Sequence, residues 1–83
     1  MSVTLYTTTW CGYCRLAKAL LDAKGVPYDE VDLDGDPAFR QRLHELTGGW
    51  TVPQVVVGGR PIGGYAELRR LDRDGRLDAL LAA

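Results

Sequence analysis

The spacing of apolar residues changes several times along the chain, and each change predicts a new element. Residues Val3–Thr7 alternate between apolar and polar and are rich in β-branched side chains, which indicates a first strand. From Cys14 the apolar positions recur at helical spacing, with charged residues on the opposite face, so an amphipathic helix is predicted. Its expected inward positions are Leu16, Ala17, Leu20 and Leu21. Gly25 and Pro27 end it.

The middle of the chain predicts a strand, a turn and a second helix. Residues 28–33 have the composition of a strand, and Asp34-Gly35-Asp36-Pro37 is a turn sequence that also caps the next helix. Pro37 is expected at the first helical position, where an N–H group has no partner in any case. The helix should run to about Thr47, with Gly48-Gly49 ending it. Its expected buried face consists of Phe39, Leu43 and Leu46.

The last third predicts a hairpin followed by two helices. Val55-Val56-Val57 and Arg60-Pro61-Ile62 are its expected strands, joined by a turn at Gly58-Gly59. Gly63-Gly64 ends the second of these strands, and a third helix is expected from Tyr65 to about Asp74, followed by a short final helix. The expected inward positions of the two helices are Leu68, Leu71, Leu77, Leu80 and Leu81.

This order of elements predicts an α/β fold in a single domain spanning residues 1–83. A strand, a helix and a strand in succession form a parallel pair with a right-handed crossover. The hairpin must be antiparallel within itself. A four-stranded mixed sheet with helices on both faces is the simplest arrangement that buries all of these apolar stripes.

Composition and charge exclude several functional classes. The chain is 46% hydrophobic and 25% charged, which is typical of a globular protein, and no segment has the apolar length of a membrane span. We find no secretory signal pattern at the start and expect a reducing, cytoplasmic location. The net charge is -1 with both signs interleaved, so nucleic acid is not an expected partner. We expect a monomer.

The two cysteines, Cys11 and Cys14, are separated by two residues and fall between the first strand and the first helix. A C-x-x-C pair at this place in a strand-helix-strand pattern is typical of a redox site. At the helix N-terminus, unpaired N–H groups and the helix dipole favour negative charge, so the pKa of the Cys11 thiol should lie below its usual value of about 8.5. Cys14, one turn further, is placed to attack a mixed disulfide on Cys11.

Three other interpretations of the pair are weaker. A zinc half-site has the same spacing, but a closed site needs four ligands and only His44 remains as a strong candidate, so we expect no bound metal. An inert structural disulfide does not fit a cytosolic chain. A protein-interaction module with vestigial cysteines would lack a reactive Cys11.

Pro53 begins the strand at residues 54–57, a place where a missing N–H is tolerated. With it, the chain resembles bacterial glutaredoxins over almost its whole length. The segments that carry the resemblance are Leu5-Tyr6-Thr7, Cys-x-Tyr-Cys at 11–14, residues 17–21, Thr51-Val52-Pro53-Gln54 and Ile62-Gly63-Gly64. The resemblance implies a thioredoxin fold with sheet order 2-1-3-4 and a cis peptide bond before Pro53.

The resemblance also implies a site for a glutathione-like tripeptide. The backbone of Val52 is expected to pair with the cysteine backbone of that ligand. Gly63-Gly64 is expected to leave the N-terminus of the third helix open for a γ-glutamyl carboxylate. Trp10 and Trp50 are expected at the rims of the groove. The full set of expected substrate-binding residues is Trp10, Gly12, Tyr13, Thr51, Val52, Pro53, Gly63, Gly64, Tyr65 and Glu67.

The sequence departs from the glutaredoxin pattern where that family commonly carries charges. Thr8 and Gly49 stand in place of two cations that grip the glycine carboxylate of the tripeptide. Ala66 stands in place of an acid, which leaves neighbouring Glu67 to reach the amino group. The turn Trp10-Cys11-Gly12-Tyr13-Cys14 also resembles that of mycoredoxins, which use the pseudo-disaccharide thiol mycothiol.

The sequence therefore predicts a thiol-disulfide oxidoreductase with no permanently bound cofactor. Cys11 is expected to attack protein disulfides and small-thiol mixed disulfides, and Cys14 to resolve them, with glutathione or mycothiol as reducing co-substrate and a reductase to recharge it. Two alternatives stay open. One is a redoxin recharged by thioredoxin reductase that supplies ribonucleotide reductase. The other is an iron-sulfur carrier, because Gly12 replaces the usual Pro and loosens the turn.

Overall fold

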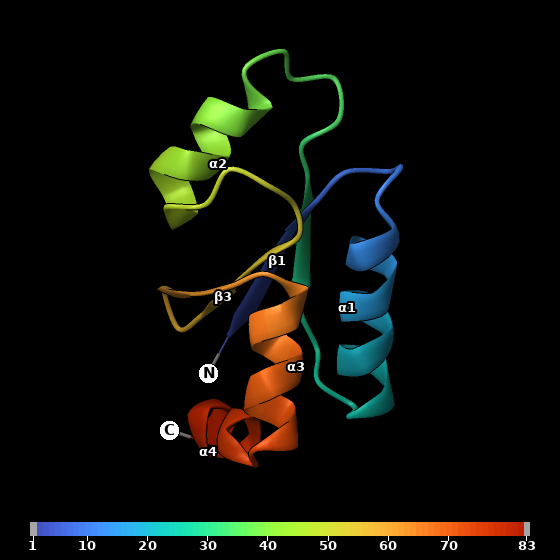
Figure 1. Ribbon diagram of the computed structural model, residues 1–83, viewed down its shortest axis with the longest axis vertical. Helices are drawn as coiled ribbons and strands as arrows, with labels where there is room; N and C mark the ends of the chain where they lie inside the picture. Colours follow the sequence, from blue (N-terminus) through green and yellow to red (C-terminus); the bar gives the residue numbers. More distant parts are fainter. Residues whose placement is uncertain (1, 83) are drawn as a thin grey trace.

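A mixed sheet of four strands forms the centre of the structure, a computed structural model that describes residues 2–82 (Figure 1). The elements are β1 (Val3–Thr7), α1 (Gly12–Ala23), β2 (Asp29–Asp32), α2 (Phe39–Thr47), β3 (Gln54–Val57), β4 (Arg60–Gly63), α3 (Tyr65–Arg73) and α4 (Arg76–Ala82). The sheet order is β2-β1-β3-β4. β1 is parallel to β2 and antiparallel to β3, and β3 is antiparallel to β4. The predicted α/β fold and strand order are confirmed.

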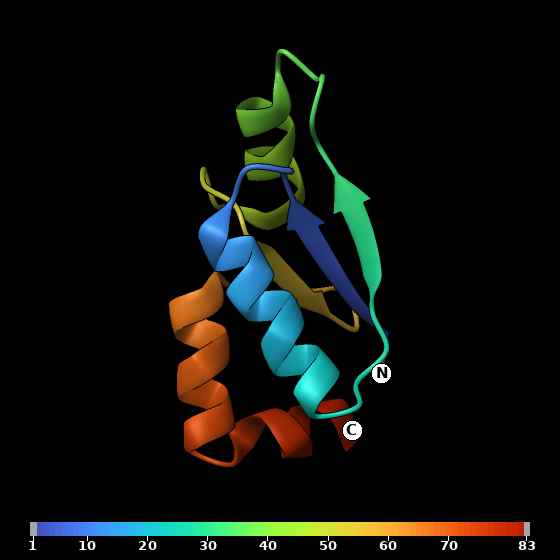
Figure 2. The ribbon, with the colours of Figure 1, turned by 90° about the vertical axis from the view of Figure 1, so that its right-hand side faces the viewer.

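Alternation along β1 places its apolar residues on one face of the sheet. Val3 and Leu5 are buried there, and they form one core cluster with buried residues of α1, β3, α3 and α4. The remaining members of the cluster are Ala17, Leu21, Val55, Val57, Leu68 and Leu77. α1 and α3 lie side by side along this face, and α2 covers the other (Figures 1 and 2). Leu43 of α2 is fully buried outside the cluster, as expected for helices on both faces.

The turn between β3 and β4 is formed by two glycines, as predicted. Gly58 has a φ of 56° and Gly59 a φ of 81°. Positive values at both positions are typical of the type I′ turn, whose twist matches that of the two strands it joins. Glycine adopts these values without steric cost, so the local sequence specifies the hairpin.

Two leucines predicted to face inward are exposed. Leu16 of α1 is 47% exposed, because the buried face of this helix is centred on Cys14, Ala17 and Leu21, and Leu16 falls outside it. Leu46 is 49% exposed, because α2 packs chiefly against β3 and only Leu43 of this helix is buried.

The start of α2 also differs from the prediction. The helix begins at Phe39, so Pro37 is not its first residue. Asp36 forms a turn instead: its Oδ1 accepts a hydrogen bond from the Ala38 N–H at 2.9 Å, and its carbonyl oxygen accepts one from the Phe39 N–H at 3.1 Å. β2 is likewise shorter than the predicted strand at 28–33. Within residues 2–82, no helix is long and apolar enough to cross a membrane.

Candidate active site around Cys11 and Cys14

Cys11 is the N-cap of α1 and Cys14 lies in its first turn. Sγ of Cys11 accepts a hydrogen bond from the backbone N–H of Cys14 at 3.1 Å. The two cysteines form a disulfide, with their Cα atoms 5.2 Å apart. Cys14 is 1% exposed whereas Cys11 is half-buried. The pair is therefore asymmetric: the sulfur that solvent reaches more readily is the one that receives a helix N–H group.

The loop between α2 and β3 faces this pair. The Val52–Pro53 peptide bond is cis, as the family resemblance implied, and Pro53 is buried. The carbonyl oxygen of Val52 lies 3.7 Å from Cys11 Sγ. Segments forty residues apart along the chain thus meet at one sulfur, because α1 and β3 both begin at the same end of the sheet (Figure 1).

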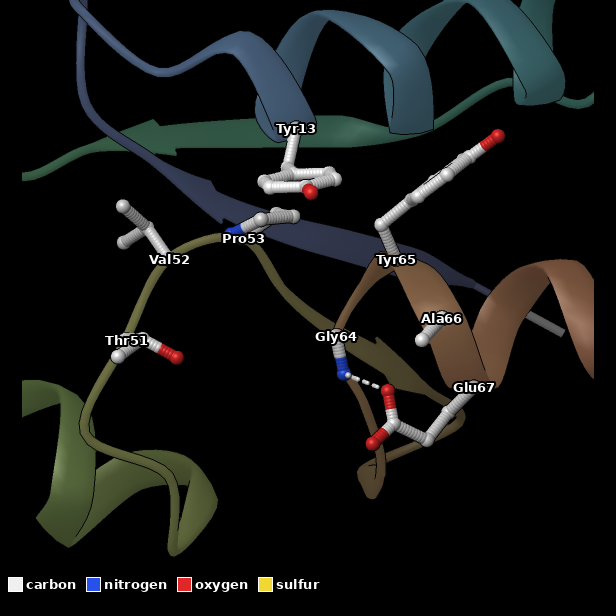
Figure 3. A pocket seen from close by; sticks show the side chains of 8 residues that line it. All are labelled: Tyr13, Thr51, Val52, Pro53, Gly64, Tyr65, Ala66 and Glu67. Carbon is white, nitrogen blue, oxygen red and sulfur yellow. Dashed lines mark hydrogen bonds between the residues drawn. The ribbon is translucent and has the colours of Figure 1, made fainter.

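A pocket of about 280 Å³ opens beside the loop. It is lined by Tyr13, Thr51, Val52, Pro53, Gly64, Tyr65, Ala66 and Glu67 (Figure 3). The ring of Tyr13 lies over Pro53, and the ring centroids of Tyr13 and Tyr65 are 6.1 Å apart. Seven of these eight residues were candidates from the sequence alone, and the structure brings them together.

Ala66 is the lining residue that sequence reasoning did not include among the candidates. Its position is the one at which glutaredoxins commonly carry an acid, so the departure itself was the available signal. Trp10, Gly12 and Gly63 lie close in sequence to lining residues but do not line the pocket.

The N-terminus of α3 is occupied by a side chain of the same helix. Gly64 is the N-cap, and its N–H donates a hydrogen bond to Oε2 of Glu67 at 3.1 Å (Figure 3). The sequence predicted that this N-terminus is open to an anion. In the structure, an anion that used the Gly64 N–H would have to displace the Glu67 carboxylate.

Trp50 is held by α2 and does not line the pocket. Its indole stacks on the imidazole of His44 with centroids 3.9 Å apart and planes at 9°. Nη1 of Arg40 donates a hydrogen bond to the Trp50 carbonyl oxygen at 3.0 Å. Sequence reasoning missed Arg40, which brings a guanidinium beside the loop. Trp10 is 89% exposed, so neither tryptophan belongs to the core.

Thr8 lies in a different hollow from the candidate pocket. That hollow contains Asp34 and Asp36, and Asp34 accepts a hydrogen bond from the N–H of Thr9 at 2.9 Å. Among residues 2–82, no three His, Cys, Asp or Glu side chains gather into a group that could hold a metal ion.

Comparison with known proteins agrees with this geometry. The family model described as Glutaredoxin matches residues 3–62. A glutaredoxin of Pseudomonas aeruginosa is 48% identical over 81 residues, which cover 98% of this chain and 96% of that protein. Glutaredoxin 3 of Escherichia coli is 44% identical over 80 residues, covering 96% of each. The crystal structure of a buckwheat glutaredoxin-glutathione complex matches with a TM-score of 0.87 and 36% identity, over 96% of this chain and 76% of that chain.

Proposed function

Because this chain belongs to the glutaredoxin family, whose members are thiol-disulfide oxidoreductases, we propose that it reduces protein disulfides and small-thiol mixed disulfides at the expense of a low-molecular-weight thiol. Cys11 and Cys14 form the active motif. The observation that carries the assignment of roles is the position of Cys11 Sγ. It receives the Cys14 N–H at the N-terminus of α1, faces the Val52 carbonyl, and is more exposed than Cys14.

In the proposed reaction, the Cys11 thiolate attacks one sulfur of the substrate disulfide. A bond forms between Cys11 and that sulfur, the substrate bond breaks, and the other sulfur leaves as a thiolate that takes up a proton. Cys14 then loses its proton and attacks Cys11 Sγ, which releases the second substrate thiol. Two electrons have passed to the substrate, and the protein holds the Cys11–Cys14 disulfide. Two molecules of the small thiol restore the dithiol by the same exchange.

The pocket is proposed to hold the non-protein half of a mixed disulfide. Thr51, Val52 and Pro53 supply a backbone segment beside Cys11 whose polar groups could pair with the backbone of a short peptide ligand. The other residues proposed for substrate binding, from the sequence, are Trp10, Gly12, Tyr13, Gly63, Gly64, Tyr65 and Glu67. Tyr13 and Tyr65 give the pocket an aromatic wall.

Glutathione and mycothiol are the two proposed co-substrates. A glutathione complex of the buckwheat relative favours the first. The uncharged Thr8, Gly49 and Ala66 favour a thiol without charged ends, as does the Glu67 carboxylate on the Gly64 N–H. Arg40 brings a cation to the loop through its hydrogen bond to the Trp50 carbonyl oxygen. We therefore propose that this protein binds glutathione more weakly than a typical glutaredoxin does.

The setting proposed for this reaction is the cytoplasm, where thiols are kept reduced. The chain is proposed to act as a monomer and to receive electrons from a reductase through the small thiol.

The test separates the two cysteines. Cys11→Ser should abolish all turnover, because no thiolate remains at the helix N-terminus. Cys14→Ser should retain reduction of a small-thiol mixed disulfide, since a free thiol in solution can release the product, and should lose most reduction of protein disulfides. Equal loss from both substitutions contradicts the assigned roles.

A second measurement identifies the electron source. Turnover of the wild-type protein is compared with glutathione, with mycothiol and with thioredoxin reductase as reductant. Turnover with thioredoxin reductase alone would support the redoxin alternative. A visible absorption band after anaerobic reconstitution with iron and sulfide would support the iron-sulfur alternative.

A further inference from the structure

Two adjacent arginines, Arg69 and Arg70, follow the pocket-lining residues of α3, and both side chains are exposed. Tyr65 and Ala66 line the pocket. Residues three or four positions apart in a helix lie on the same face. Arg69 is four residues after Tyr65, and Arg70 is four residues after Ala66. Neither arginine lines the pocket itself, so the pair lies just outside it, about one helical turn of 5.4 Å along α3.

The acidic side chains that are spaced to neutralise this pair bind elsewhere. Glu67 is three residues before Arg70, but its Oε2 accepts a hydrogen bond from the N-cap N–H of its own helix at 3.1 Å (Figure 3). Asp72 is three residues after Arg69, but its Oδ1 pairs with Nζ of Lys24 in α1 at 2.7 Å. Among the residues that the structure describes, no ion pair involves either arginine. Two positive charges therefore lie next to the pocket without a counter-charge from these residues.

The substrate of the proposed reaction has a part that must cross the rim of the pocket. A mixed disulfide has two halves, and the pocket is proposed to hold the small-thiol half, so the polypeptide half extends over the rim. On the α2 side, the guanidinium of Arg40 is already engaged by the Trp50 carbonyl oxygen at 3.0 Å. On the α3 side, the two exposed guanidinium groups are available to the polypeptide. Exposed cations beside a binding site raise the local concentration of an oppositely charged partner.

We propose that Arg69 and Arg70 select protein substrates that carry acidic residues beside the target cysteine. The proposal rests on the proposed function, because it concerns the protein half of the mixed disulfide whose other half occupies the pocket. The two guanidinium groups attract carboxylates at long range and donate charge-assisted hydrogen bonds to them on contact. The chemistry at Cys11 is unchanged. The arginine pair therefore determines which proteins are reduced, and not how the disulfide is exchanged.

The test compares two peptides that differ only in charge. Each has one cysteine linked to glutathione, flanked in the first peptide by aspartate and glutamate and in the second by asparagine and glutamine. The wild-type protein should reduce the acidic peptide with a kcat/KM about three- to tenfold higher at low salt, chiefly through a lower KM, as expected when two exposed charge pairs form. At about 1 M salt, where the screening length falls to about 3 Å, the preference should disappear.

A double variant and a matched control locate the effect. Arg69→Gln combined with Arg70→Gln should abolish the preference and change the kcat/KM of the neutral peptide less than about twofold. The control combines Arg60→Gln with Arg76→Gln, which removes the same charge. Both of these side chains are exposed, one at the hairpin end of β4 and the other at the start of α4, away from the pocket (Figure 1). The control should keep most of the preference.

Three results overturn the proposal. The first is a preference that survives in the variant of Arg69 and Arg70. The second is an equal loss in the control variant, which would assign the effect to net charge. The third is an equal rise of KM for both peptides in the variant of Arg69 and Arg70, which would mean that the arginines bind the carboxylates of glutathione.

Failure of the proposed function gives a different result. If the wild-type protein turns over neither glutathionylated peptide, the same two peptides are activated as pyridyl disulfides and mixed with the reduced protein, so that no small thiol takes part. Faster reaction of Cys11 with the acidic peptide, lost in the variant of Arg69 and Arg70, supports the arginine pair although the small-thiol function has failed. Equal rates with the two peptides overturn it.

Discussion

At the scale of single residues, the chemistry depends on the hydrogen bond that the Cys14 N–H donates to Cys11 Sγ. The donor belongs to the first turn of α1, so it stays in place when the disulfide is reduced to two thiols. A thiolate gains more from such a donor than a thiol does, because the hydrogen bond is then charge-assisted. The helix dipole acts in the same direction.

We therefore predict that the pKa of the Cys11 thiol lies well below its usual value of about 8.5 in the reduced protein. Thiolate absorbance against pH measures it, with Cys14→Ser as the background in which only Cys11 titrates. A midpoint at or above the usual value would mean that the helix N-terminus does not stabilise the anion.

A second residue-scale prediction concerns Thr8. Charge-assisted hydrogen bonds to a carboxylate are worth roughly 1.5 to 3 kcal/mol each, so an added lysine should strengthen binding of the glycine end of glutathione. Thr8→Lys should lower the KM for a glutathionylated peptide about tenfold and leave a mycothiol-linked substrate unchanged. Thr8→Gln is the control for side-chain length without charge. High wild-type affinity for glutathione with no gain from Thr8→Lys would show that the departures from the family pattern are tolerated variation.

At this scale the sequence predicted those site residues that belong to recognisable motifs. Tyr13 and Thr51-Val52-Pro53 could be placed in the pocket because their motifs are local and in order. The hydrogen bond from the Gly64 N–H to the Glu67 carboxylate could not be predicted. A carboxylate near the start of a helix can cap its own helix or remain free to bind a ligand, and the sequence pattern is the same in both cases. Arg40 was missed, since its hydrogen bond to the Trp50 carbonyl oxygen depends on the path of the loop that follows α2.

At the scale of elements, the side chain of Glu30 connects the edge strand β2 to β1 and α1. Its Oε2 accepts a hydrogen bond from Thr7 Oγ1 of β1 at 2.6 Å and pairs with Lys18 Nζ of α1 at 2.8 Å. The hydrogen bond from Lys18, and then that from Thr7, lower the pKa of the Glu30 carboxyl from its usual 4.5. A lowered pKa in the folded state contributes stability above the unfolded pKa, and this contribution is lost as the pH falls through the folded value.

Glu30→Gln should therefore lower the free energy of unfolding at pH 7 by about 0.5 to 1 kcal/mol, a small value because both side chains are about one-third exposed. The difference from wild type should shrink as the pH falls below 4.5. Urea unfolding at a series of pH values measures it, with Glu45→Gln on the exposed face of α2 as control. A difference that stays constant through the acid range would show that Glu30 acts by packing and not by charge.

Element types and order could be predicted because each element has its own period, and the errors have local causes. Pro37 was placed inside α2 because proline favours a first helical position, but the Asp36 side chain stabilises a turn that delays the helix to Phe39. Leu46 has the correct spacing to join Leu43, yet it is exposed, since spacing does not show how much of a helix a sheet will cover.

At the scale of the whole molecule, one cluster joins the elements that hold the site. Leu68 of α3 is fully buried in it, together with Ala17 and Leu21 of α1 and Val55 of β3. These three elements carry the C-x-x-C pair, the end of the Thr51–Pro53 loop and the Gly64 N-cap. Packing in this cluster therefore sets both the stability and the relative placement of the pocket walls.

Leu68→Ala should lower the free energy of unfolding by about 2 to 5 kcal/mol, a large share of the roughly 5 to 15 kcal/mol of a typical domain. Leu46→Ala, on the exposed side chain of α2, should change it by less than about 0.5 kcal/mol. Urea denaturation of both variants makes the comparison. Similar losses from the two would contradict the division between core and surface described for these helices.

The exposure of Trp10 has an optical consequence. Its indole is 89% exposed and directly precedes Cys11 in the chain. A disulfide close to an excited indole accepts an electron from it and quenches its fluorescence, whereas two thiols quench less. Trp50, the other of the two tryptophans, is stacked on His44. In a Trp50→Phe background the emission of Trp10 should therefore rise on reduction, which gives a dye-free reading of the oxidation state during turnover.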